Sequence, residues 1–153
     1  MKVLAILIIF FITQANSNEE ILSQGICDEN EIEKVNDVKR TVENNLIYAT
    51  SISKTTDNSV ELLAFYSEGK LLKITATSSV SVSEQIFFNS DSQMVYYERF
   101  GYSGGKEFFE INYFRGNALF CRENGLNGEK VKFSRKAGQK IIDVVEKYLL
   151  EIQ

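Results

Sequence analysis

Residues 60–123 read VELLAFYSEGKLLKITATSSVSVSEQIFFNSDSQMVYYERFGYSGGKEFFEINYFRGNALFCRE and contain three segments with the same layout. Segments 65–72, 87–96 and 113–120 each begin with two adjacent aromatic residues, continue through Gly, Asn, Asp or Ser, and return to apolar residues. Aromatic residues suit β-strands, and Gly and Asn supply the positive φ angles that tight hairpin turns require. The offsets between the segments are 22 and 26 residues, which does not fit the fixed period of a solenoid or propeller. The run therefore predicts an antiparallel meander.

A helix is predicted on each side of this meander. Asp28 is placed to cap the first helix, and Asn44-Asn45 ends it. Apolar residues recur at helical spacing in both segments: Ile32, Val35, Val38 and Val42 in the first, and Ile141, Ile142, Val144, Val145, Tyr148, Leu149 and Ile152 in the second. Between the first helix and the meander, residues 46–55 read as a further strand. We expect an α+β fold, an antiparallel β-meander of about six or seven strands with the N-terminal and C-terminal helices packed on one face.

Residues 1–17 have the layout of a signal peptide. Lys2 provides a positive start, Val3–Ile12 is an unbroken apolar run, and small residues follow, so that cleavage after Ala15 and cleavage after Ser17 both fit. The apolar run is shorter than the roughly 20 residues that a membrane span needs. We expect a secreted or periplasmic protein with no membrane attachment after cleavage, in which residues 18–153 form a single α+β domain.

The chain has two cysteines, Cys27 and Cys121. An even number of cysteines in an exported chain indicates a disulfide, because the compartment is oxidising. The bridge would join the start of the first helix to the last long strand of the meander. Two buried free thiols are the alternative.

Composition excludes several kinds of chemistry. Without Lys2 the chain has 16 Lys and Arg residues against 21 Asp and Glu residues, a net charge of −5, which does not favour nucleic-acid binding. The chain has no His, so His-based nucleophilic and metal sites are impossible. Four carboxylates lie on neighbouring predicted strands: Glu84, Glu98, Glu107 and Glu110. Solvated strand charges are the default explanation for them, and glycoside hydrolysis by two of them is the one catalytic alternative. We expect no enzyme, no cofactor and no metal.

The strands place aromatic residues on both faces of the sheet. If helices cover one face, the other is an open surface with aromatic rings among charges, a composition that is common at contact sites. Strand parity selects the candidates for partner binding: Phe65, Tyr97, Arg99, Phe108, Phe114 and Phe120. We expect a non-catalytic binding module that engages a protein partner, as inhibitors and immunity proteins do. Two alternatives stay open: cross-strand pairs that only stabilise the sheet, and a carrier of an apolar ligand between the sheet and the C-terminal helix.

The order of signal peptide, helix, aromatic hairpins and closing helix resembles that of small exported bacterial proteins of unknown function. The tracts Glu61–Lys73 and Asn112–Arg122 carry this resemblance. It implies a fold class and a compartment, and it assigns no role to any residue.

Overall fold

The computed structural model describes residues 27–79, 81–125 and 127–153. The signal peptide predicted for residues 1–17 lies outside this part of the chain. Among the described residues, eight strands form one antiparallel sheet in which every strand pairs with its neighbours in the sequence. Their bounds are β1 Thr50–Thr55, β2 Val60–Ser67, β3 Lys70–Ser78, β4 Val82–Phe88, β5 Met94–Ser103, β6 Lys106–Arg115, β7 Ala118–Asn124 and β8 Glu129–Lys130. The predicted α+β meander is confirmed, with a two-residue β8 as its last strand.

The helices begin where their capping residues predict. Helix α1 spans Glu29–Asn45, and the carboxylate of Asp28 accepts hydrogen bonds from the first backbone N–H groups of the helix. Helix α2 spans Arg135–Glu151 and is capped by the Ser134 hydroxyl, which accepts from the Ala137 N–H at 3.1 Å. None of the helices in the described ranges is both long enough and apolar enough to cross a membrane.

The chain between α1 and β1 differs from the prediction. Residues 46–49 were expected to extend the first strand, but Leu46–Tyr48 form a short 3₁₀ helix, η1. The Ala49 N–H donates to the Leu46 carbonyl at 3.1 Å, so the tight turn satisfies a backbone group that α1 leaves unpaired at its end.

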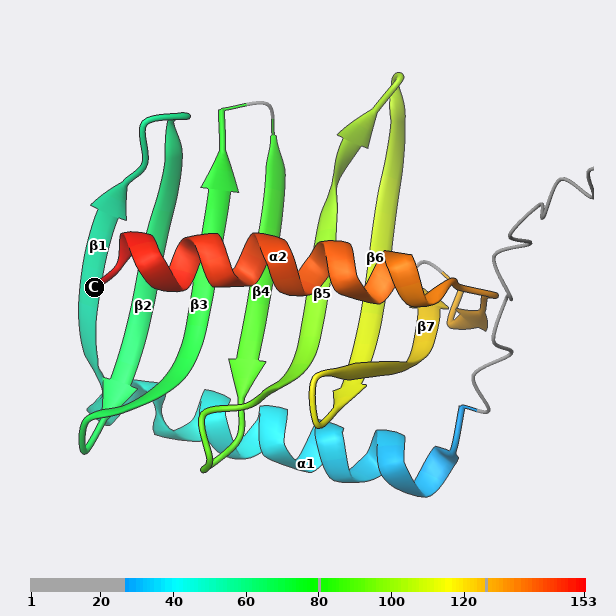
Figure 1. Ribbon diagram of the computed structural model, residues 1–153, viewed down its shortest axis with the longest axis horizontal. Coiled ribbons are helices and arrows are strands. Elements are labelled where there is room, and N and C mark those ends of the chain that lie inside the picture. Colours follow the sequence, from blue (N-terminus) through cyan, green and yellow to red (C-terminus); the bar gives the residue numbers. More distant parts are fainter. Residues whose placement is uncertain (1–26, 80, 126) are drawn as a thin grey trace, which may run out of the picture.

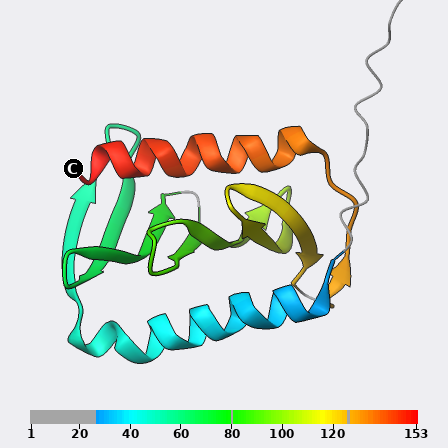
Figure 2. The same ribbon diagram turned by 60° about the horizontal axis from the view of Figure 1, so that its bottom comes forward.

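The two helices lie on opposite faces of the sheet, so the prediction that both pack on one face is wrong. Figure 2 shows the sheet between α1 and α2. Ile86 and Phe87 illustrate the reason: they are adjacent in β4, point to opposite faces, and are both completely buried. Helix α2 packs on the face of Ile86, and α1 packs on the face of Phe87. Because both faces are apolar in the middle of the sheet, each one requires a helix.

Helix α1 covers only one end of its face. It packs on residues near the β4–β5 connection and on β7, among them Phe87, Val95, Tyr96 and Cys121. Figure 1 shows α1 crossing the strands at that end, whereas the β5–β6 hairpin extends to the opposite end of the sheet. The aromatic residues of this hairpin therefore lie beyond the reach of the helix.

The predicted disulfide is confirmed. Cys27, just before α1, is bonded to Cys121 of β7, and the two Cα atoms are 4.8 Å apart. Cys121 is completely buried. The bridge fixes the first turn of α1 to the sheet, and such bonds belong to oxidising compartments.

Candidate binding site at the β5–β6 hairpin

The β5–β6 hairpin places a row of cross-strand pairs on the α1 side of the sheet. Phe100 pairs with Phe109, and Tyr102 pairs with Glu107. Residues that pair directly in an antiparallel sheet share a face, so these four side chains are neighbours. Gly104 and Gly105 close the hairpin with φ angles of 58° and 76°, which permit a two-residue turn.

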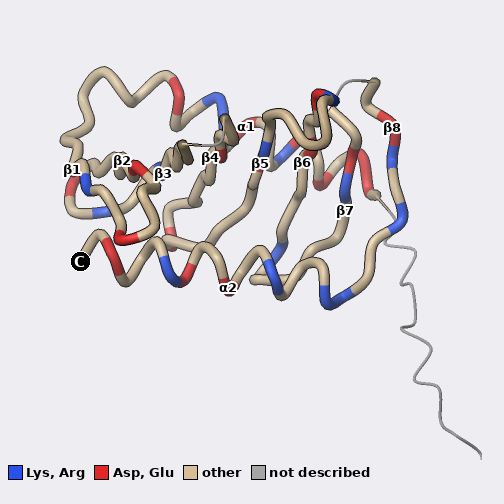
Figure 3. The backbone as a smooth tube through the Cα atoms, turned by 90° about the horizontal axis from the view of Figure 1, so that it is seen from above, with Lys and Arg blue, Asp and Glu red and all other residues tan. Residues whose placement is uncertain are grey.

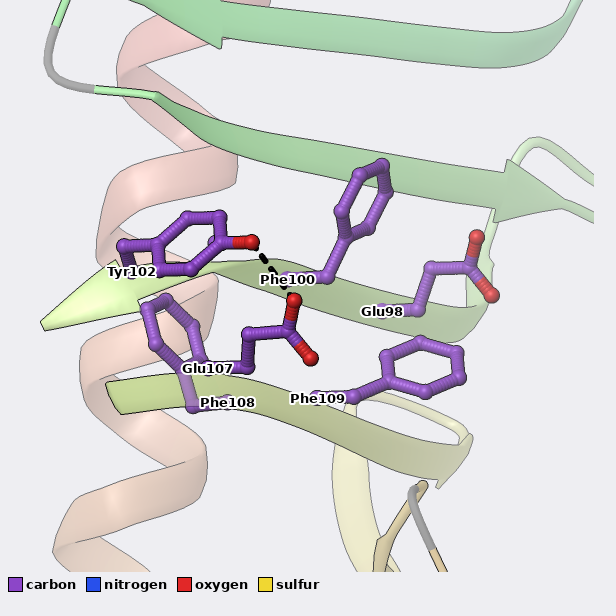
Figure 4. A pocket seen from close by; sticks show the side chains of 7 residues that line it. Glu98, Phe100, Tyr102, Glu107, Phe108 and Phe109 are labelled. Carbon is purple, nitrogen blue, oxygen red and sulfur yellow. Dashed lines mark hydrogen bonds between the residues drawn. The ribbon is translucent and has the colours of Figure 1, made fainter. Parts of the chain in front are cut away.

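A pocket of about 420 Å³ opens between these side chains. Its lining consists of Glu98, Phe100, Gly101, Tyr102, Glu107, Phe108 and Phe109. The rings of Phe100 and Phe109 meet edge to face, with centroids 6.2 Å apart, and the Tyr102 hydroxyl donates to Glu107 Oε1 at 2.6 Å. Figure 4 shows the Glu107 carboxylate among the rings of Phe100, Tyr102 and Phe109. We call this site the hairpin pocket; it combines aromatic faces with two carboxylates.

Gly125 holds the position of one wall. The Gly125 N–H donates to the Phe109 carbonyl at 2.7 Å, and a Cβ added at position 125 would overlap the Phe109 ring. The turn after β7 therefore packs its backbone directly against this ring. Close backbone approach is a role that only glycine fills without strain.

A lysine of α1 is held beside the pocket, on the same face of the sheet. Lys39 Nζ lies 3.2 Å from Glu98 Oε2, 4.5 Å from the ring centroid of Tyr96 and 5.5 Å from that of Phe87. The Tyr96 hydroxyl donates to the same Glu98 oxygen at 2.8 Å. We call this arrangement the internal lysine site. Burial, and then the charge of Glu98, raise the pKa of the Tyr96 hydroxyl far above its ordinary value.

Replacing Lys39 by Met is expected to destabilise the protein by about 3 kcal/mol, because Glu98 is buried and would lose its cation. Urea unfolding of the variant measures this change. The double variant Lys39→Met/Glu98→Gln removes both charges and should recover most of the loss. A double variant no more stable than Lys39→Met would show that the ion pair is not the cause.

The six residues selected by strand parity do not share one open face, which corrects that part of the prediction. Tyr97 and Phe114 are buried in the core under α2. Phe120 packs on the α1 side, and Phe65 pairs with Lys73, whose ammonium lies over Phe87 on that side.

The structure brings some of the six together: Tyr97 and Arg99 both line a cleft beside α2, and Arg99 also contacts Phe108. Arg99 covers the ring of Phe108, with Cζ 5.2 Å from the centroid. Phe108 also lines the hairpin pocket, together with Phe100, Tyr102 and Phe109, which strand parity did not select. A binding role for the six residues stays a prediction.

A second cleft lies between α2 and the sheet and has a volume of about 600 Å³. Its lining is Glu84, Tyr97, Arg99, Glu110, Arg122, Ser134, Lys136, Ala137, Lys140, Ile141, Val144 and Tyr148. Figure 3 shows that Lys and Arg gather toward the N-terminal half of α2. A carrier of an apolar ligand requires an apolar cavity, whereas four cations and two carboxylates line this cleft.

The carboxylates of this cleft are engaged by the protein itself. Glu84 accepts a hydrogen bond from the Tyr148 hydroxyl at 2.8 Å and lies 3.5 Å from Arg99 Nε. Glu110 lies 2.9 Å from Arg122, which also donates to the buried amide of Asn112. These contacts tie α2 to the sheet and join neighbouring strands.

Comparison of the chain with protein-family models, with curated proteins and with solved structures finds no match. Neither a family nor a relative therefore assigns a role to any residue. A function for this protein is therefore proposed from the contacts of the described residues.

Proposed function

We propose that the protein is an exported, non-catalytic binding module that engages a protein partner through the hairpin pocket. One observation carries the proposal: Phe100 is 40% exposed and Tyr102 is 58% exposed, side by side at an end of the sheet that α1 does not cover. Large aromatic side chains exposed together mark contact surfaces more often than single exposed residues do.

The pocket is also suited to binding because its walls are held in place. Phe100 and Phe109 lie on paired strands and contact each other, and Gly125 supports Phe109 from behind. Aromatic anchors that are ordered before binding lose little conformational entropy when a partner covers them. Exposed residues such as Ile47 and Leu150 do not line this pocket.

The signal segment and the disulfide support a location outside the cytoplasm, secreted or periplasmic. A disulfide such as Cys27–Cys121 is typical of oxidising compartments, and residues 1–17 have the layout of an export signal. A partner would therefore be met in the periplasm or outside the cell.

A non-catalytic role agrees with the state of the carboxylates. The four carboxylates considered for hydrolysis divide between two sites, Glu84 and Glu110 in the α2 cleft and Glu98 and Glu107 in the hairpin pocket. Three of the four are ion-paired with basic residues of the chain: Glu98 with Lys39, Glu84 with Arg99, and Glu110 with Arg122.

The proposal is tested with a photo-crosslinking residue at position 102 and, as the control, at exposed position 47 on η1. We expect position 102 to capture one specific protein from the fluid into which the cell exports this chain. Phe100→Ala should weaken the affinity for the purified partner at least about tenfold, because a central aromatic anchor is lost.

Ile47→Ala removes exposed apolar surface elsewhere and should leave the affinity unchanged. Equal affinities for the Phe100→Ala and Ile47→Ala variants would place the interface outside the hairpin pocket and contradict the proposal. Circular dichroism shows in each case that the variant is folded.

A further inference from the structure

We infer that the hairpin pocket accepts a lysine side chain from the partner protein. This inference rests on the proposed function and specifies the chemistry of the partner. It follows from a comparison of the pocket with the internal lysine site next to it along β5, where the chain binds a lysine of its own.

The internal lysine site shows which groups hold an ammonium in this protein. Aromatic rings of Phe87 and Tyr96 lie within 5.5 Å of Lys39 Nζ, and the Glu98 carboxylate neutralises its charge. Cations are attracted to the negative face of an aromatic ring, and the attraction is stronger where water is excluded. An ammonium is thus bound by two rings and one carboxylate.

The hairpin pocket repeats this composition one step further along the strands. Phe100 and Tyr102 follow Tyr96 and Glu98 in β5 at the same two-residue spacing, so all four side chains point to one face. Phe109 supplies a further ring, and Glu107 supplies the exposed carboxylate. The described lining includes Glu98 and Glu107 but no Lys or Arg. Lys39 neutralises Glu98, so the negative charge of the pocket comes from Glu107, which forms no ion pair among the described residues.

The Glu107 carboxylate can accept a further hydrogen bond. The Tyr102 hydroxyl donates to Oε1, which orients the carboxylate among the rings. A carboxylate has about four lone-pair sites on its two oxygens, so an ammonium can approach while the tyrosine contact persists. The geometry suits a donor that enters from solvent.

The protein's own contacts supply a lysine precedent for this composition. Lys39 Nζ lies 4.5 Å from the ring centroid of Tyr96, and Lys73 Nζ lies 4.6 Å from that of Phe87. Net acidity of the chain also favours a basic partner.

The inference is tested by titrating the protein with a short peptide that contains one lysine and with the same peptide containing norleucine. Norleucine keeps the aliphatic stem and removes the ammonium. Ring signals of Phe100, Tyr102 and Phe109 in NMR spectra report on occupancy. We expect these signals to shift with the lysine peptide, and Glu107→Gln to weaken binding about fivefold.

Glu61→Gln is the matched control, because it removes one exposed carboxylate from β2 outside the pocket. It should leave the affinity for the lysine peptide unchanged. Equal binding of the norleucine peptide, or equal weakening by Glu61→Gln and Glu107→Gln, would overturn the inference. Tighter binding of tetramethylammonium than of the lysine peptide would overturn the assignment to a protein side chain.

The crosslinked partner separates this inference from the proposed function. If Phe100→Ala lowers the affinity for the partner and Glu107→Gln does not, the pocket binds a protein and the lysine assignment is wrong. If neither variant lowers this affinity, the proposed function itself is wrong.

Discussion

Reduction of the Cys27–Cys121 disulfide is expected to lower the free energy of unfolding by about 4–5 kcal/mol. The bridge closes a loop with a sequence separation of 94 residues, and a cross-link of that length removes this much chain entropy from the unfolded state. Domains of this size have a total stability of about 5–15 kcal/mol, so the loss is a large part of the whole. Urea unfolding with and without reductant measures it.

The double variant Cys27→Ala/Cys121→Ala provides the control. It should resemble the reduced protein and should not respond to reductant. Serine is unsuitable at position 121, because a hydroxyl would be placed in a completely buried site. If reductant leaves the unfolding midpoint of the natural chain unchanged, the disulfide contributes nothing to stability.

Stability is expected to fall steeply above about pH 10, the ordinary pKa of tyrosine. Burial, and then neighbouring carboxylates, raise the pKa of Tyr96, Tyr97, Tyr113 and Tyr148 in the folded protein. Above the ordinary pKa the unfolded chain releases these protons while the folded chain retains them, so rising pH favours unfolding. Each tyrosine lowers the free energy of unfolding by about 1.4 kcal/mol per pH unit. The three most buried, Tyr96, Tyr97 and Tyr113, together lower it by about 4 kcal/mol per unit.

Tyr113→Phe isolates the contribution of one hydroxyl. Tyr113 donates to Glu123 at 3.1 Å and is buried, and phenylalanine keeps the ring without the titrating group. The slope of stability against pH between about pH 10 and 12 should decrease by about 1.4 kcal/mol per unit. Urea unfolding at several alkaline pH values provides the slope, and an unchanged slope would exclude Tyr113 as a contributor.

The fold could be predicted where local sequence determines local structure. Asp28 caps α1 as its spacing predicts, and the aromatic, turn and apolar segments produce consecutive hairpins. The side of the sheet that each helix covers could not be predicted, because alternation shows only which residues share a face. Ile86 and Phe87 are equally apolar, and neither indicates which helix will cover it.

The candidate site was missed for the same reason. Phe109 and Tyr113 are four residues apart in β6, so alternation puts them on one face. Tyr113 is buried under α1, whereas Phe109 lines the hairpin pocket beyond the end of the helix cover. The position of that boundary depends on where α1 crosses the strands. The disulfide at Cys121 and the contacts of Ile32, Val35 and Val42 fix the place where α1 crosses. These are tertiary contacts, so the local sequence does not reveal the boundary.

The strict agreement between strand order and chain order has a consequence for how the molecule assembles. Each strand can join an edge formed by residues synthesised immediately before it, so the sheet grows by short-range steps, which topology makes fast. Contacts between distant parts of the chain form separately, among them the bond between Cys27 and Cys121 and the packing of α2 on the sheet. A chain that emerges from a pore with its N-terminus first would therefore form its sheet early. Helix α2 would pack on the sheet only after the C-terminus has left the pore.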